Sequence, residues 1–270
     1  MKTQSLKRNN YFSPGRFFLL LKRDFLTNYR TIIITTAAVA GFVIFSSSIS
    51  ALTHSREEFH SKLYFMLLYL GGFIVTSRAF KEMYNSRKSY TYVTLPGSTL
   101  EKFSVKLIST SIGYVLGTLL IYSVIAAISE GLNQLLFGYT HTLLSPFSRA
   151  FLIGAAAFLV IQGLFLAGAA FFKKNAFIKT ILTLTLLAIA LLIIAIFTAR
   201  LIFPGSFEGL HQMNQEFNSM RELTEWLGLT EARLRMVGRT IRLVLRILFW
   251  AVLAPLCWTI SYLKFRKIEV

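Results

Sequence analysis

Six long runs of apolar residues, none interrupted by a charged side chain, constrain this chain more than any other feature of its sequence. The runs occupy residues 31–52, 63–77, 107–129, 150–172, 180–199 and 247–263. A hydrocarbon core about 30 Å thick is crossed by about 20 apolar residues in a helix, and the two shorter runs can extend into their flanks. Backbone polar groups in lipid are satisfied only in helices or closed barrels, and unbroken runs lack the alternation of barrel strands. We therefore predict an all-α, polytopic membrane protein with six transmembrane helices.

The basic residues are distributed unequally between the alternate loops that these spans define. The chain carries 29 Lys and Arg against 12 Asp and Glu, a net charge of +17. Of the 29, 19 lie on the side of both termini and 10 on the opposite side. Basic loops stay in the cytoplasm, so we expect both termini to be cytoplasmic. The positive charge then faces anionic lipid, and we expect no nucleic-acid partner.

The expected domain order is a cytoplasmic N-terminus (1–30), a six-helix transmembrane domain (31–264) and a cytoplasmic C-terminus (265–270). Within the first region, aromatic side chains such as Phe17 and Phe25 gather near one helical face, and arginines recur every seven residues on the other. We predict an N-terminal helix that lies in the headgroup region of the membrane. The alternative is a merely basic flank of the first span.

Groups that drive chemistry are absent from the predicted spans. Between their boundaries the six runs contain no Asp, Glu, Lys, Arg or His. Ion-driven transporters and intramembrane enzymes place such residues at membrane depth. The chain also has no G-x-x-x-x-G-K-[ST] phosphate loop, so we expect it not to bind ATP itself. We therefore predict no enzymatic activity and no directly bound cofactor, and any work must draw energy from a partner.

Metal-ligand residue types occur together in the loop after the first span, at His54, Glu57, Glu58 and His60. Their spacing matches no H-E-x-x-H pattern, and no further ligand is near in sequence. The sequence therefore predicts a solvated loop and no metal site. The single cysteine, Cys257, excludes a disulfide within the chain and is expected to be a small packed residue of the last span.

Two repeated spacings predict contact surfaces. From the end of the segment 204–240, which we expect outside the cell, up to the last apolar run, arginines spaced 4, 3 and 4 share one helix face. They are Arg235, Arg239, Arg242 and Arg246. This strip either snorkels to lipid phosphates or lines the exit path of an anionic or amphiphilic substrate. In the third span, Gly113 and Gly117 form a G-x-x-x-G spacing, which serves helix packing within the chain or a subunit interface.

The cytoplasmic segment between the second and third spans (78–104) contains several local structure signals. Phe80, Met83 and Tyr84 are spaced as one apolar face of a short helix, surrounded by basic residues. The letters YTYVTL then predict extended chain, and Pro-Gly predicts a turn. Ser98-x-x-Glu101 is a capping box, in which each side chain satisfies the backbone of the other residue. The third helix is therefore expected to begin at Thr99, before the hydrocarbon.

This segment resembles a known family. An aromatic and basic stretch followed by TLPGSTLEKF, directly before the third of six spans, resembles the permease subunits of type-2 ATP-binding-cassette (ABC) exporters. Many bacterial members carry a similar Leu-Pro-small-Ser-x-x-Glu-Lys-Phe run. The ending SYLKFRKIEV resembles their usual close, a Tyr near the end of the last span followed by basic residues and Glu. The resemblance covers nearly the whole chain.

The resemblance implies a multi-pass subunit of a bacterial cell membrane (inner or plasma), paired with a second copy or a homologous permease. Two cytoplasmic ABC ATPase subunits would bind ATP and magnesium, and the segment 78–104 would act as coupling helix. The implied ATPase contacts are Arg78, Phe80, Lys81, Glu82, Met83, Tyr84, Arg87 and Lys88. The matching turn and cap are Leu95, Pro96, Gly97, Ser98, Glu101 and Lys102, with Gly97 standing where Ala is frequent. Substrate specificity is expected in 204–240.

Three functions follow from these observations. The first is a permease subunit that forms the substrate pathway and moves substrate outward when a partner hydrolyses ATP. The second is a membrane sensor or scaffold whose basic loops bind a cytoplasmic partner without transport. The third is a membrane-embedded enzyme that uses the outer His/Glu loop. An adjacent gene for a stand-alone ATPase would favour the first.

Overall fold

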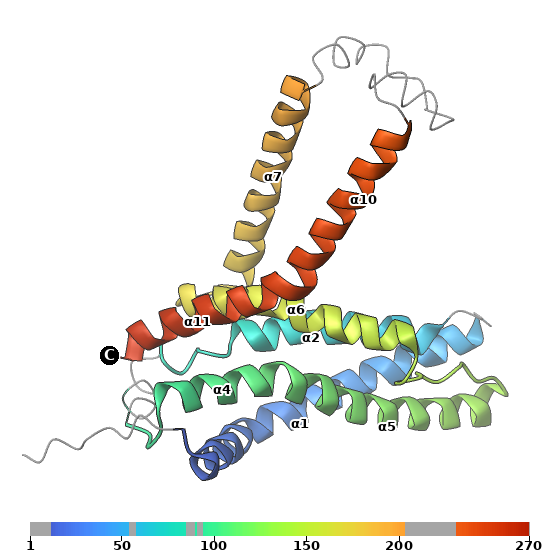
Figure 1. The fold of residues 1–270 in the computed structure, drawn as a ribbon. Helices are drawn as coiled ribbons and strands as arrows, with labels where there is room; N and C mark the ends of the chain where they lie inside the picture. Colours follow the sequence, from blue (N-terminus) through green and yellow to red (C-terminus); the bar gives the residue numbers. More distant parts are fainter. Residues whose placement is uncertain (1–11, 54–57, 85–89, 91–93, 203–230, 270) are drawn as a thin grey trace, which may run out of the picture. The chain divides into compact units, whose positions relative to one another are not determined.

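The computed structural model describes residues 12–53, 58–84, 90, 94–202 and 231–269. Regular structure in these residues is helical, and no strand occurs among them (Figure 1). The elements are α1 (Pro14–Leu52), α2 (Phe59–Ser77), α4 (Thr99–Thr110), α5 (Ile112–Phe137), α6 (Arg149–Phe171), α7 (Ala176–Ile202), α10 (Glu231–Ile247), the π-helix η2 (Leu248–Leu253) and α11 (Ala254–Glu269). The predicted all-α class is confirmed.

Six helical stretches among the described residues are long and apolar enough to cross a membrane. They are Pro14–Leu52, Phe59–Ser77, Thr99–Phe137, Arg149–Phe171, Ala176–Thr198 and Gly238–Ile268. Each overlaps one of the apolar runs of the sequence. Most begin several residues before the run. A helix can extend beyond the residues that cross the hydrocarbon, into polar flanks and a capping residue. The prediction of six helices able to span a membrane is therefore confirmed.

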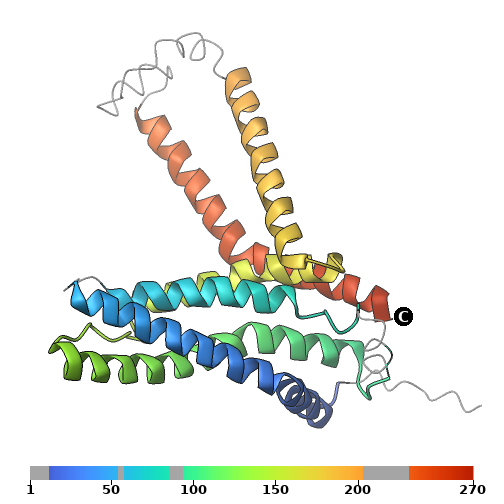
Figure 2. The ribbon, with the colours of Figure 1, turned by 180° about the vertical axis from the view of Figure 1, so that it is seen from behind.

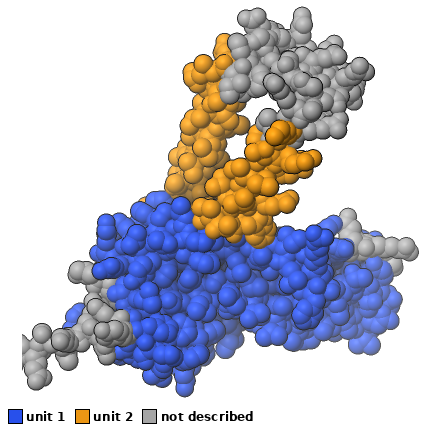
Figure 3. Space-filling view, in the orientation of Figure 1, with its two compact units in different colours: residues 1–177, 254–270 blue, residues 178–253 orange. Residues whose placement is uncertain are grey.

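The chain divides into two compact units, shown in different colours in Figure 3. The first comprises residues 1–177 and 254–270, and the second comprises residues 178–253. In the first unit, α1 packs against α4 and α5, α2 packs against α5 and α6, and α11 packs against α4 and α6 (Figures 1 and 2). The second unit contains most of α7 together with α10 and η2.

One core of the first unit lies between α1, α2, α5 and α6. Its largest buried side chains include Tyr64, Leu68, Tyr122 and Phe158. Gly72 of α2 allows the ring of Phe158 to approach so closely that an added Cβ would lie 2.4 Å from it. Because interiors are close-packed, this contact fixes how α2 and α6 sit against each other.

A second core fastens the turn after α2 to the rest of the first unit. Phe80 of this turn, Phe103 of α4, Leu166 of α6 and Phe265 of α11 are all buried together. The ring of Phe265 lies 5.1 Å from that of Phe80 and 5.8 Å from that of Phe103, measured between centroids. The connection between α2 and α4 therefore rests on three helices.

Two interruptions in the long helices have local causes. Between α4 and α5, the hydroxyls of Thr110 and Ser111 donate to the carbonyls of Lys106 and Leu107, at 2.8 and 2.5 Å. Such bonds from Ser or Thr to the preceding turn bend helices. Between α10 and α11, the π-helix η2 ends two residues before Pro255. Proline lacks an N–H and clashes with the carbonyl four residues earlier, so the preceding turn widens.

Helix α1 continues without a helical break through the boundary predicted at residue 30. Its 39 residues correspond to about 58 Å at 1.5 Å per residue, about twice the thickness of a hydrocarbon core. A large part of α1 must therefore lie outside the hydrocarbon. Figure 1 shows the first turns of α1 running in a different direction from the remainder. An N-terminal segment along the membrane surface stays a prediction.

Helix α7 exposes nearly all of its apolar side chains. Only 6% of its most apolar window is buried within the chain. Exposed leucines and isoleucines follow one another along most of its length. An apolar surface of this extent needs a cover of lipid or of another protein chain.

Candidate functional site

The capping box expected at the start of α4 is present. The Glu101 backbone N–H donates to Ser98 Oγ at 3.2 Å, and the Ser98 backbone N–H donates to Glu101 Oε2 at 2.7 Å. Helix α4 begins at Thr99, as the sequence predicted. Both polar partners are buried. This cap fixes where the helix starts and how the preceding turn enters it.

The other oxygen of Glu101 binds the beginning of α1. Glu101 Oε1 accepts from the Ser13 backbone N–H at 2.6 Å and from Arg16 Nη2 at 2.9 Å. One carboxylate therefore joins the cap of α4 to the first turn of α1. We call Ser13, Arg16, Ser98 and Glu101 the Glu101 joint. The sequence analysis found its Ser98–Glu101 half, and only the fold brings Ser13 and Arg16 to it.

Residues around the joint explain two features of the predicted turn. A Cβ at Gly97 would lie 3.1 Å from Leu20 and 3.3 Å from Glu101 Oε2, so glycine leaves room for the carboxylate. Leu95 packs against the second core, and Lys102 is buried with contacts to other residues. Along α4, Lys106 forms an ion pair with Asp24 of α1. The turn is thus firmly held.

The apolar residues expected to contact an ATPase face the interior of this chain. Phe80 and Met83 are buried in the second core. Burial raises the pKa of Tyr84, whose hydroxyl donates to the Ala170 carbonyl at 2.6 Å. Phe80 and Met83 therefore offer no exposed surface to a partner, whereas Tyr84 is half-buried and its predicted contact with an ATPase stays a prediction. All three side chains anchor the turn, because its apolar face packs against α4, α6 and α11 of the same chain.

Exposed charges remain as contact candidates in the same turn. Arg78 and Lys81 are exposed and Glu82 is half-buried, whereas Arg87 and Lys88 lie outside the described residues. Hydrogen bonds in this turn run from residue i to i−3, as from Lys81 N to Arg78 O at 3.0 Å. The described part is a series of tight turns, so a regular coupling helix stays a prediction.

The extended segment predicted before the turn is wrong where the structure describes it. The Thr94 backbone N–H donates to the Tyr90 carbonyl at 3.0 Å, an i to i−4 bond. The alternating aromatic and β-branched residues favoured extended chain. Tyr90 and Thr94 are therefore joined by a helix-type bond, and residues 91–93 lie outside the described residues.

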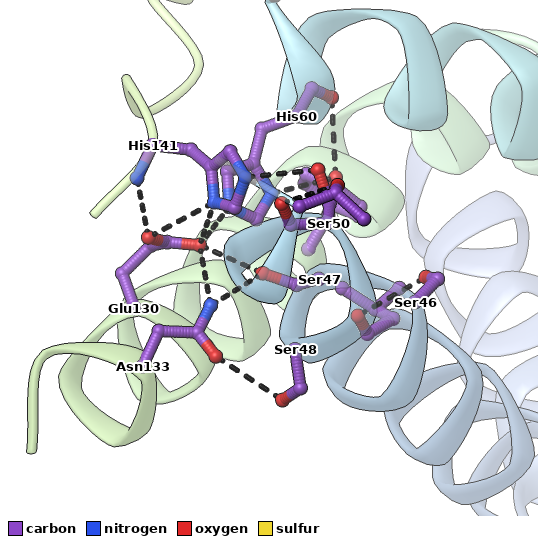
Figure 4. Close-up of polar contacts among 11 residues, drawn as sticks. Ser46, Ser47, Ser48, Ser50, His60, Glu130, Asn133 and His141 are labelled. Carbon is purple, nitrogen blue, oxygen red and sulfur yellow. Dashed lines mark hydrogen bonds and ion pairs between the residues drawn. The ribbon is translucent and has the colours of Figure 1, made fainter. Parts of the chain in front are cut away.

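A second polar cluster lies where α1 and α5 end and α2 begins (Figure 4). Its members are Ser47 of α1, His60 of α2, Glu130 and Asn133 of α5, and His141 of the segment after α5. All five are buried. We call them the Glu130 cluster. Glu101 and Glu130 are 29 residues apart, or about 40 Å along helix, so the two acids lie near opposite ends of α4 and α5.

The contacts of the cluster converge on one carboxylate. Glu130 Oε1 lies 2.7 Å from His60 Nε2 and 3.1 Å from His141 Nδ1. The same oxygen accepts from Ser47 Oγ at 2.8 Å and from Asn133 Nδ2 at 3.2 Å. The His141 backbone N–H donates to Oε2 at 2.6 Å. Two imidazoles and a carboxylate in this arrangement can share a proton or bind a cation.

The second nitrogen of each imidazole is also held. His60 Nδ1 lies 3.0 Å from the Tyr122 hydroxyl, and His141 Nε2 lies 3.0 Å from Ser50 Oγ. These contacts fix the orientation of both rings toward Glu130. Potential ligand atoms of His60, Glu130 and His141 all lie within 4.8 Å of one another.

This cluster corrects the prediction of a solvated His/Glu loop. His60 belongs to α2 and is completely buried, whereas His54 and Glu57 lie outside the described residues and Glu58 is exposed. The partners of His60 are 70 and 81 residues away, which is why local spacing did not reveal them. A usable signal was Glu130 placed directly after the third apolar run, with Asn133 one turn later on the same face.

The glycine pair Gly113 and Gly117 makes no close helix contact within the described residues. A Cβ at Gly117 would meet nothing within 4 Å, and one at Gly113 would meet only the Ile108 carbonyl of the preceding turn. Packing within the chain, one of the two expected roles, is therefore not seen there. The other expected role, an interface with another subunit, stays a prediction.

The arginine strip lies on α10, within the second unit. Arg239, Arg242 and Arg246 are exposed, while the side chain of Arg235 lies outside the described part of the chain. Cys257 is buried and free, as expected. An exposed strip suits either lipid phosphates or an anionic substrate, so both predicted roles stay open.

Comparisons of the chain with protein-family models, curated proteins and solved structures find no match.

Proposed function

We propose that this chain is the membrane-spanning permease subunit of an ABC exporter, working with separate ATPase subunits. The observation that carries the proposal is the Glu101 joint, whose Ser98–Glu101 half lies within the run that resembles the exporter permeases. One buried carboxylate holds the cap of α4 and the first turn of α1 together. Movement at the turn before α4 would therefore reach two membrane helices at once.

The second core would carry a displacement of the turn after α2 to the membrane helices. A partner that pressed on the exposed Arg78 or Lys81 would push a turn anchored by Phe80 on α4 and α11. Close-packed interiors transmit such displacements instead of absorbing them. The turn, α4 and α1 would then move as one body, and the substrate pathway would open as their positions relative to the other helices changed.

Copurification from native membranes tests the proposal. The chain, tagged at its C-terminus and extracted in mild detergent, is expected to bring with it a subunit that contains a nucleotide-binding phosphate loop. The purified chain alone is expected to hydrolyse no ATP, since it carries no phosphate loop. ATP hydrolysis by the chain alone, or a partner set without any ATPase, would refute the permease assignment. The second outcome would favour a sensor or scaffold.

A further inference from the structure

We propose that the Glu130 cluster binds one divalent transition-metal ion of the Zn²⁺ class. The ligands are His60 Nε2, His141 Nδ1 and the carboxylate of Glu130. This inference does not depend on the proposed transport function. It rests on three observations, namely the ligand distances, the crowding at one carboxylate oxygen and the contacts that orient the imidazoles.

Two of the three separations between ligand atoms are already close to those that a metal requires, and all three lie within 4.8 Å. Zinc binds imidazole nitrogen and carboxylate oxygen at about 2.0–2.2 Å, which places neighbouring ligands of a tetrahedral site about 3.3 Å apart. In the structure Glu130 Oε1 lies 2.7 Å from His60 Nε2 and 3.1 Å from His141 Nδ1. These two distances need to lengthen by only about half an ångström or less to admit the ion. Two His and one Glu also form a ligand set that leaves a fourth position open.

Glu130 Oε1 has more neighbours than one oxygen can accept as hydrogen-bond donors. Four side-chain atoms, from His60, Ser47, His141 and Asn133, lie within 3.2 Å of it. A carboxylate offers about two lone-pair directions per oxygen. With a metal ion at this point, both imidazoles bind the ion. Ser47 and Asn133 then remain as the hydrogen-bond donors that orient the carboxylate.

One tautomer of His60 suits a cation between its ring and Glu130. The Tyr122 hydroxyl has one hydrogen, and it lies 3.1 Å from the His60 carbonyl and 3.0 Å from His60 Nδ1. When Tyr122 donates to the carbonyl, Nδ1 must donate to Tyr122, and neutral His60 presents the lone pair of Nε2 to a carboxylate oxygen. Two acceptors at 2.7 Å repel each other unless a cation or a proton lies between them. A metal-binding imidazole has this arrangement, with its other nitrogen donating to a fixed oxygen.

Charge and burial are consistent with a divalent ion. Two neutral imidazoles and one carboxylate carry a single negative charge, and all three groups are buried. A buried carboxylate is costly unless it is paired. The ligands come from α2, α5 and the segment that follows α5, so an ion would fasten that segment to the bundle.

Cobalt titration tests the proposal without depending on any variant. The full chain is purified through a tag without histidine, stripped with a chelator and titrated with Co²⁺. We expect visible d–d bands that saturate at one Co²⁺ per chain and disappear when Zn²⁺ is added. The zinc affinity is then measured by competition with a chromophoric chelator.

Variants assign the ion to the cluster. His60→Gln and His141→Gln should each weaken zinc binding at least 100-fold, whereas His211→Gln, a control for general histidine binding, should leave it unchanged. Tyr122→Phe keeps the ring and removes the hydroxyl that orients His60, so it should weaken binding about 10- to 100-fold. Absence of the Co²⁺ bands at one equivalent, or unchanged zinc affinity in both ligand variants, would show a hydrogen-bonded cluster without metal and overturn the proposal.

Discussion

Arg16 and Glu101 form an ion pair with Nη2 2.9 Å from Oε1, although 85 residues separate them in the sequence. The carboxylate side chain is completely buried, and that of Arg16 is 29% exposed. The same carboxylate accepts from the backbone of Ser13 and of Ser98. Removing it would leave donors at the starts of two helices without their acceptor. Its loss should therefore destabilise the start of α1 as well as the cap of α4.

We predict that Glu101→Ala destabilises the chain much more than Ser98→Ala. Loss of the cap hydroxyl should cost about 1 kcal/mol. Loss of Glu101 removes the acceptor of the Ser13 and Ser98 backbone N–H groups and of Arg16 at once, and each buried donor left without an acceptor typically costs about 1–3 kcal/mol. Unfolding in detergent by added SDS, followed by tryptophan fluorescence, measures both. Leu100→Ala, an exposed position of α4, is the matched control. Equal losses for the two variants would contradict the joint.

Substitutions at Gly72 and at Gly117 are predicted to differ in their effect on stability. Gly72→Ala should destabilise the fold by about 1–3 kcal/mol, because the new Cβ would overlap Phe158. Gly117→Leu should leave the stability of a single chain nearly unchanged, since a Cβ at that position would meet nothing within 4 Å among the described residues. If α5 contacts a second chain there, crosslinking of copies in membranes should fall. Destabilisation of the single chain by Gly117→Leu would contradict the open surface.

The orientation in the membrane is predicted from charge. In a Cys257→Ala background, cysteines introduced at Glu58 and Gln212 should react with an impermeant maleimide added to intact cells. A cysteine introduced at Asn85 should react only after the membrane is opened. This follows from the 19 basic residues on one side against 10 on the other. Labelling of residue 85 in intact cells would show that this loop is outside and would contradict the predicted orientation.

The fold was largely predictable because its main signals are local. Apolar runs long enough for a membrane mark the helices, and Ser98 and Glu101 mark the start of α4 within four residues. The ends of α1 and α5 were less predictable. The length of an apolar run shows which residues can cross the hydrocarbon, but it does not show where the helix ends outside it. Glu130 shows the consequence: it follows the apolar run by one residue and still belongs to α5.

The sites were predictable only where their partners are neighbours in sequence. Arg16 reaches Glu101, and His60 reaches Glu130, through tertiary packing that no spacing rule encodes. Phe80 and Met83 show the opposite error. Their helical spacing correctly indicated an apolar face, but spacing alone does not say whether that face meets another protein or the core of its own chain.

Charge and apolar variants of the turn after α2 should separate binding from stability. Phe80→Ala should cost about 3–5 kcal/mol in unfolding, because it empties a buried site between α4 and α11. Lys81→Glu should change stability by less than about 0.5 kcal/mol, as expected for an exposed position. On the exporter proposal, it should still weaken copurification of the ATPase. Normal ATPase binding by both Lys81→Glu and Arg78→Glu would place the contact elsewhere.

We predict that the Glu101 joint couples ATP hydrolysis to transport. The variant Glu101→Gln tests this coupling most directly. Glutamine keeps the size of the side chain but has one acceptor oxygen, whereas Glu101 uses Oε2 for the Ser98 backbone and Oε1 for Ser13 and Arg16. The variant can therefore keep the cap of α4 or the link to α1, but not both. In the assembled complex in vesicles, ATP hydrolysis should persist while substrate-dependent transport falls several-fold. Glu58→Gln, an exposed acid before α2, controls for charge removal. A Glu101→Gln complex that assembles and transports with the wild-type ratio of substrate moved to ATP hydrolysed would reduce the joint to an ordinary helix start.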